Sequence, residues 1–221
     1  MKGKLDSFDI IEKIDSFESP KTRQPAMLRE YGVYPELERV EVPFEAGEAE
    51  VPRYVDCYIQ DAERRAEGYP PDMGGGRFAP GDYRYAFQVL MWLLRTRRIA
   101  RGAKFLEWGS GQGMVAILAQ LLGLEAMGVE LDARLVAESR ELAARFDTLA
   151  RFVRGTYDPE STDPDIDVVT AEGRAAVYVY PWPGEEAFFL RLFEDTADDG
   201  TYLLVCLGPE DIRVYRKVAA P

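Results

Sequence analysis

The segment Phe105-Leu106-Glu107-Trp108-Gly109-Ser110-Gly111-Gln112-Gly113 joins an apolar run to three alternate glycines. The run is typical of a buried strand, and the apolar residues after Gly113 predict a helix. Glycines permit backbone dihedrals and close approaches that a Cβ blocks, and the first turn of a helix directs unpaired N–H groups and a positive dipole end into the preceding loop. The segment therefore predicts a strand–loop–helix cradle for a polar small molecule.

Strands and helices alternate after this segment. We predict strands over 104–108, 126–131, 150–154, 175–180, 201–207 and 211–218, and helices over 113–122, 133–146 and 185–196. Asp167–Thr170 fits either a short strand or the end of a helix. Alternation of this kind produces βαβ crossovers, so we expect an α/β fold whose mostly parallel, twisted sheet carries helices on both faces.

The chain divides in sequence into an N-terminal extension, residues 1–81, and a main domain, residues 82–221. In the extension we predict a short helix over 8–17, a hairpin of 37–44 with 50–55, and a helix over 54–66. The Gly- and Pro-rich stretch 69–81 is either a mobile lid or a plain linker. Asp82 is the predicted N-cap of a mostly buried helix that ends in Arg95-Thr96-Arg97-Arg98.

The composition of the chain limits which classes of function are possible. The 221 residues suffice for one α/β domain with an extension, and their net charge of −12 repels phosphate backbones, which disfavours a nucleic-acid partner. The sequence contains no histidine, so Ser-His-Asp and Cys-His nucleophiles and His-ligated metal sites are excluded. Cys57 and Cys206 form no metal-spacing cluster. With no export signal and no apolar run that spans a bilayer, we expect a cytoplasmic protein without a metal or a membrane partner.

Glu130 follows the second predicted strand, next to the glycine loop. At the carboxyl end of such a strand a carboxylate can accept hydrogen bonds from both hydroxyls of a ribose, so a nucleoside-containing ligand is indicated. A dinucleotide loop has the spacing G-x-G-x-x-G/A, and here Met114 stands at the third position, where only a small side chain fits.

The pattern Glu-x-Gly-x-Gly-x-Gly of residues 107–113 resembles instead the first motif of class I S-adenosylmethionine-dependent methyltransferases. The resemblance extends from about Asp82 to Leu207 and implies a Rossmann-like fold, S-adenosylmethionine as cofactor and methyl transfer as activity. It implies the cofactor-binding residues Glu107, Gly109, Ser110, Gly111, Gly113, Glu130, Leu131, Thr156 and Tyr157. Glu107 would then meet the methionine ammonium directly or through water. The acid that this family places near adenine is absent after the third strand. Asp158 lies one or two positions further along the sequence than that acid would.

Tyr180-Pro181-Trp182-Pro183-Gly184 follows the fourth strand, where methyltransferases of this class contact the substrate. It resembles the Asn/Asp-Pro-Pro-Tyr element of amino methyltransferases in position only, because the carboxamide or carboxylate is missing. Aromatic rings there can flank a sulfonium; the alternative is a rigid turn with Trp182 packed in the core. The candidate substrate residues are Tyr180, Pro181, Trp182, Phe78 and Tyr83, and the candidate bases are Tyr180, Tyr157 and Asp82.

These features predict a methyltransferase that acts on a small molecule or a protein side chain. The glycine loop together with the preceding helix, residues 82–94, also faintly resembles the protein-lysine methyltransferases that use this fold. The alternative is a non-catalytic sensor or scaffold that binds S-adenosylmethionine or another nucleoside; aminopropyl transfer on the same fold lacks a polyamine pocket motif. The family's sheet usually continues with a helix and a hairpin after the fifth strand. Because only 208–221 follow here, the sheet is shorter or an N-terminal strand completes it.

Overall fold

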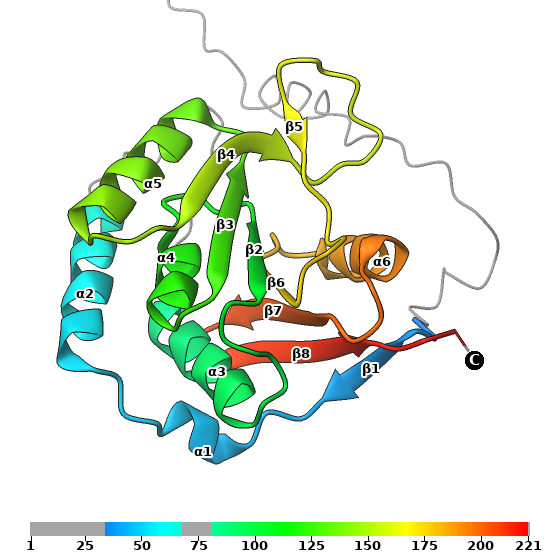
Figure 1. Cartoon of the computed structure of the whole chain (residues 1–221), viewed down its shortest axis with the longest axis horizontal. Coiled ribbons are helices and arrows are strands. Elements are labelled where there is room, and N and C mark those ends of the chain that lie inside the picture. The colour runs from blue at the N-terminus through cyan, green and yellow to red at the C-terminus, as the bar shows by residue number, and fades with distance from the viewer. Residues whose placement is uncertain (1–33, 68–80, 221) are drawn as a thin grey trace, which may run out of the picture. The chain divides into compact units, whose positions relative to one another are not determined.

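An eight-stranded sheet in the order β1-β8-β7-β6-β2-β3-β4-β5 forms the centre of the computed structural model, which describes residues 34–67 and 81–220 (Figure 1). The strands are β1 (Leu37–Val40), β2 (Lys104–Trp108), β3 (Glu125–Glu130), β4 (Arg151–Thr156), β5 (Asp167–Val168), β6 (Ala176–Val179), β7 (Tyr202–Gly208) and β8 (Asp211–Lys217). The pairs from β7 to β5 are parallel, whereas β8 runs antiparallel to both β7 and β1. The predicted mostly parallel, Rossmann-like α/β sheet is confirmed.

Helices cover both faces of the sheet, as predicted. They are α1 (Phe44–Gly47), α2 (Arg53–Glu67), α3 (Tyr83–Arg95), α4 (Met114–Leu121), α5 (Ala133–Arg145) and α6 (Glu186–Thr196). Figure 1 shows α2, α3, α4 and α5 on one side and α6 on the other. Each face has its own apolar cluster, the larger one beneath α3 and α4. Among the described helices, none is long and apolar enough to cross a membrane.

The predicted hairpin of 37–44 with 50–55 is wrong. Leu37–Val40 instead pairs with β8 at the edge of the sheet, and the chain then enters α1 and α2. The buried Lys217 amine at the end of β8 donates to the Glu36 carboxylate and to the Glu194 carbonyl. A long-range edge pairing has thus outweighed the local turn signal at 45–48. It also confirms the second sequence alternative, in which an N-terminal strand completes the sheet.

The crossover from β4 to β6 contains no described helix. Asp167–Thr170 begins with the two-residue strand β5. Residues 169–175, which we call the strap, then lead to the start of β6 through a turn in which the Arg174 amide donates to the Ala171 carbonyl. The Val169 amide donates to the Thr156 carbonyl at 2.8 Å, and the Ala175 amide donates to the Lys104 carbonyl at 2.9 Å. The strap is therefore anchored at both ends of the parallel sheet and takes the place of a crossover helix.

Candidate functional site

The glycine loop lies at the carboxyl end of β2, directly before α4. Gly109, Gly111 and Gly113 have φ angles of +64°, +52° and +77°, a region that L side chains rarely adopt. A Cβ added to Gly109 would meet no atom within 4 Å, so open space lies above this glycine. The alternate glycines thus serve a tight left-handed loop with an open side, which is the cradle that their spacing predicts.

The underside of the loop packs tightly on the sheet. A Cβ on Gly113 would lie 2.2 Å from the Phe152 ring and 2.9 Å from Ser139, and one on Gly128 would lie 2.7 Å from both Phe152 and Ser110. In the register of the sheet Gly128 pairs with Glu107 of β2 and with Phe152 of β4. The absence of a side chain at Gly128 lets the loop sit directly on β3. The sequence analysis missed this role, which a glycine inside a strand can signal.

Glu107 lies beneath the loop rather than on its open side. Its Oε2 accepts the Ala116 amide at 2.8 Å, which caps α4 because the N-cap residue, Gly113, has no side chain to do so. Burial raises the pKa of Glu107 to about 8, against the lowering effect of the Ala116 and Val115 amides. The expected supply of free N–H groups at this helix start is therefore partly used within the protein.

Glu130 stands at the end of β3 and faces the loop. Its Oε2 accepts the Gly111 amide and its Oε1 accepts the Asp132 amide, both at 2.9 Å. Asp132 in turn caps α5 through the Arg134 amide. These bonds fix the carboxylate, and each oxygen retains a lone pair for a further donor. Leu131, the next cofactor candidate, is 55% exposed and sits beside it.

Three buried polar atoms near the cradle have no hydrogen-bond partner among the described residues. They are Ser110 Oγ, Gln112 Oε1 and the Tyr178 hydroxyl. Tyr178 pairs with Glu107 in the register between β6 and β2, and its hydroxyl lies near the Cys206 thiol without forming a hydrogen bond of normal geometry. Unsatisfied buried polar atoms are uncommon, and two of these three belong to the glycine loop itself, which indicates that a polar ligand completes the contacts of the loop. Gln112 and Tyr178 were not among the residues predicted from sequence.

Thr156 ends β4, the strand next to β3, and Tyr157 follows it. The Thr156 hydroxyl accepts the Asp158 amide at 3.1 Å, so it shapes the turn. The Tyr157 ring packs 5.1 Å from Phe189 and 6.1 Å from Trp108. Burial raises the pKa of Tyr157 to about 12, with the carboxylates of Glu185, Glu130 and Asp158 adding to the shift. A tyrosine with this pKa stays protonated at neutral pH and can donate a hydrogen bond.

The segment after β6 presents aromatic side chains to solvent. Tyr180 is 36% and Trp182 is 40% exposed, whereas Pro181 is buried. The interpretation in which Trp182 packs in the core is therefore wrong; the intervening proline fills that position. The turn is closed by Glu185, whose Oε2 accepts the Trp182 amide at 3.2 Å. The exposed rings leave an aromatic surface at the carboxyl edge of the sheet.

Two other candidate residues, Asp82 and Tyr83, have structural roles. Asp82 caps α3 by accepting the Tyr85 amide at 2.9 Å, and its second oxygen accepts the Glu210 amide at 3.0 Å. Tyr83 is only 5% exposed and belongs to the core, and burial raises its pKa. Phe78 lies outside the described residues. Among the described residues no group of three or more acidic or Cys side chains is placed to hold a metal ion.

Comparison with known proteins adds a local sequence match. No protein-family model matches the chain. Over 76 residues, 34% of the chain, it is 31% identical to ribosomal protein L11 methyltransferase of Thermus thermophilus, and the match spans 30% of that relative's length.

Solved structures with a similar arrangement are more distant. An RNA methyltransferase of Salinibacter ruber in complex with S-adenosyl-L-homocysteine is 20% identical, with a TM-score of 0.46 and coverage of 60% of this chain and 90% of that one. A methyltransferase of Thiobacillus denitrificans in complex with the same ligand is also 20% identical, with a TM-score of 0.43 and coverage of 71% and 56%. The resemblance to methyltransferases that the glycine loop predicts is thus confirmed by a sequence match over about a third of the chain.

Proposed function

We propose that this protein binds S-adenosylmethionine and catalyses methyl transfer. The observation that carries the proposal is the glycine loop at the end of β2, which faces the fixed carboxylate of Glu130 at the end of β3. In an open parallel sheet this edge is where ligands bind. The unpartnered atoms of Ser110 and Gln112 beside the loop support a polar ligand there.

The residues of the edge suit the parts of this cofactor. Glu130 can accept both ribose hydroxyls, since its oxygens each keep a free lone pair. The open side of Gly109 suits the methionine portion, with the Glu107 carboxyl group buried beneath the loop. Thr156 and Tyr157 stand where adenine would lie, with Tyr157 as a hydrogen-bond donor or an aromatic wall.

Methyl transfer requires little of the protein beyond alignment and exclusion of water. S-adenosylmethionine supplies a methyl group already activated on a sulfonium, and the acceptor attacks in line with the sulfur. Tyr180 and Trp182 can flank the cation with their rings and cover it from solvent. Tyr180 is also the best placed of the candidate bases, because both Asp82 oxygens already accept backbone amides and Tyr157 holds its proton.

The proposed acceptor is a protein side chain or a small molecule. The net charge of −12 favours a neutral or cationic acceptor over a phosphate backbone. The Thermus relative is named for a ribosomal protein acceptor, whereas the Salinibacter protein is an RNA methyltransferase. An acceptor test therefore needs protein, small-molecule and RNA pools side by side.

Calorimetry with S-adenosylmethionine, S-adenosylhomocysteine and NAD tests the cofactor. We expect both sulfur ligands to bind and NAD not to bind, because Met114 starts α4 where a dinucleotide loop needs glycine or alanine. Binding of NAD alone would reject the proposal.

Glu130→Ala should weaken S-adenosylmethionine binding by about 1.5–3 kcal/mol, because it removes a charged acceptor that also holds the Gly111 amide. The matched control is Glu125→Ala, an exposed carboxylate at the start of the same strand, which should keep the wild-type affinity. Titration calorimetry measures both variants. Equal affinities would contradict the ribose assignment.

A second candidate function is binding without catalysis. It is favoured by the segment after β6, where Tyr180-Pro181-Trp182 offers no carboxylate or carboxamide to the acceptor. Release of S-adenosylhomocysteine in the presence of the acceptor pools separates the two functions. A protein that binds both sulfur ligands but releases none across all pools is a sensor or scaffold.

A further inference from the structure

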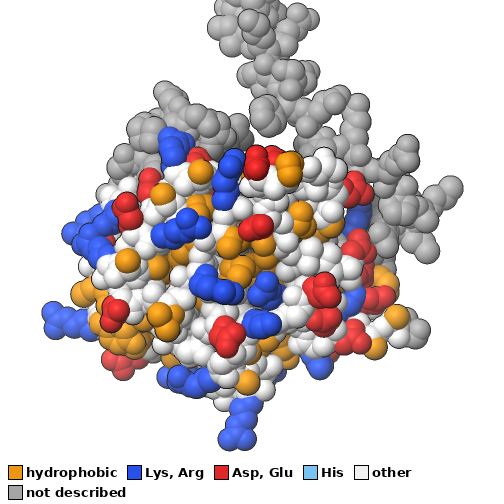
Figure 2. All heavy atoms as spheres, turned by 45° about the horizontal axis from the view of Figure 1, so that its top comes forward, with side chains coloured by type: hydrophobic (Ala, Val, Ile, Leu, Met, Phe, Trp, Pro, Cys, Tyr) orange, Lys and Arg blue, Asp and Glu red, His pale blue; other side chains and the backbone are white. Residues whose placement is uncertain are grey.

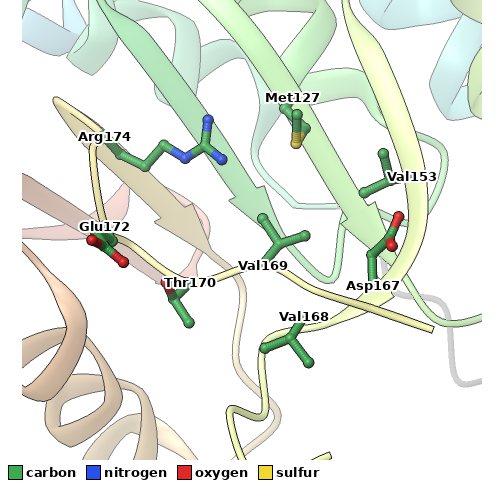
Figure 3. Close-up of a pocket in the computed structure, with 8 residues that line it drawn as sticks. All are labelled: Met127, Val153, Asp167, Val168, Val169, Thr170, Glu172 and Arg174. Atoms are coloured by element: carbon green, nitrogen blue, oxygen red, sulfur yellow. The ribbon is translucent and has the colours of Figure 1, made fainter. Parts of the chain in front are cut away.

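A hollow lies on the α6 side of the sheet, between β3, β4 and the strap that replaces the crossover helix. Its volume is about 430 Å³, within the usual range of small-molecule sites. Eight of the described residues line it, namely Met127, Val153, Asp167, Val168, Val169, Thr170, Glu172 and Arg174 (Figure 3). It includes none of the cradle residues, so it is a separate cavity.

One wall of the hollow is apolar. Met127 of β3 and Val153 of β4 are half-buried and project from the middle of their strands, and Val168 is 42% exposed. A crossover helix would cover this part of the sheet in a doubly wound fold. Figure 2, in which the end of the molecule bearing β4 and β5 is turned toward the viewer, shows hydrophobic side chains at the surface with Lys and Arg side chains beside them.

The end of the hollow near β6 is cationic. Arg174 extends from the strap toward Met127, as Figure 3 shows, and its Nε is buried without a hydrogen-bond partner among the described residues. Burial lowers the pKa of Arg174, and the neighbouring guanidinium of Arg151 lowers it further. Neither Arg174 nor Arg151 forms an ion pair with another described residue. Two adjacent cations, one with a buried unsatisfied N–H, form a suitable seat for an anion.

The two carboxylates of the hollow lie away from this seat. In Figure 3 the Asp167 carboxylate stands at the opposite wall beside Val153, and the Arg174 side chain runs away from Glu172. Both acids are exposed, so solvent screens them more than it screens the Arg174 Nε. An anionic group is therefore favoured at Arg174, with an uncharged remainder along the valines and Met127.

We propose that this hollow binds a small monocarboxylate with a short alkyl chain. The carboxylate accepts hydrogen bonds from Arg174 within the positive field of Arg151, and the alkyl chain covers Met127, Val153 and Val168. The ligand differs in class from the nucleoside proposed for the cradle, and this site needs neither the cofactor nor methyl transfer.

Hexanoate is the probe and hexylammonium its counterpart of opposite charge. We expect titration calorimetry to show at least tenfold tighter binding of hexanoate than of hexylammonium. Arg174→Gln should weaken hexanoate binding at least tenfold, since it removes a charge-assisted hydrogen bond. The control Arg95→Gln removes an exposed arginine at the end of α3 and should leave the affinity unchanged. Val168→Asp, which adds a negative charge at the exposed wall, should also abolish binding.

Methionine methyl NMR locates the bound probe on the full chain without any cofactor. Among the described residues Met127 is the only methionine that lines the hollow, and a Met127→Leu variant assigns its signal. Hexanoate should shift the Met127 methyl signal, and the shift should saturate at the calorimetric affinity. Equal or tighter binding of hexylammonium, unchanged affinity in a folded Arg174→Gln variant, or binding that leaves the Met127 signal in place would each overturn the proposal.

Discussion

Gly113→Ala should lower the free energy of unfolding by about 2–5 kcal/mol. Two costs add at this position. At a φ of +77° a Cβ is strained by about 1–2 kcal/mol, and the same Cβ would lie 2.2 Å from a Phe152 carbon in a packed core, where overpacking costs about 1–3 kcal/mol. The Phe152 ring has little room to move, because it also lies against Gly128.

Gly102→Ala is the matched control for this prediction. Gly102 has the same φ of +77°, and a Cβ there would meet nothing within 4 Å, so this variant carries the backbone strain alone. Urea unfolding of the two variants should show Gly113→Ala to be the less stable by at least about 1 kcal/mol. Equal losses would mean that the contact with Phe152 is not rigid.

Glu107→Gln should leave stability nearly unchanged at pH 4 and raise it at pH 9. The carboxyl has a pKa of about 8 in the folded protein against 4.5 for an ordinary glutamate. Between these two values the folded state keeps a proton that the unfolded state has lost, so wild-type stability falls as pH rises through this window and levels off above about 8. Glutamine is neutral throughout and can still accept the Ala116 amide through its carbonyl oxygen.

The stability gain of Glu107→Gln at pH 9 should reach a few kcal/mol, at 1.36 kcal/mol per pKa unit. Denaturant unfolding of wild type and variant at several pH values measures this gain. The contributions of titratable groups that both proteins share cancel in the difference between the two free energies of unfolding. The control Glu125→Gln changes an exposed carboxylate at the start of β3, and its stability relative to wild type should not change with pH in this way. A pH-independent difference between wild type and Glu107→Gln would show that Glu107 does not retain its proton. If Glu107 also serves the methionine ammonium, the more stable variant should bind S-adenosylmethionine more weakly.

The cradle was predictable because its determinants are local. Gly109, Gly111 and Gly113 lie within five residues of one another, and each needs a conformation that only glycine adopts readily. The bounds of Lys104–Trp108 follow likewise from a short apolar run between turn residues. Glu130 could be placed because parallel strands bring their carboxyl ends to one edge.

Other features depend on contacts between distant residues. The pairing of Leu37 with Lys217 leaves no mark in the local sequence, so 37–44 was assigned to a hairpin instead. The Phe152 ring beneath Gly113 depends on the register of two strands, and Glu107 caps α4 only because the loop folds back over it. Trp182 is exposed, and the neighbouring Pro181 is buried at the position that Trp182 was expected to fill. Local propensity cannot supply such information.

The edge pair β1–β8 has a consequence for synthesis on the ribosome. Lys217 bonds to Glu36, which precedes it by 181 positions, so β1 emerges long before the strand with which it pairs. The closure of so long a loop has an entropic cost, which is offset only by contacts that form once the whole chain has been made. The sheet can therefore assemble from β2 to β7 while β1 waits unpaired. The final hydrogen bonds of the fold then join its earliest described strand to its last.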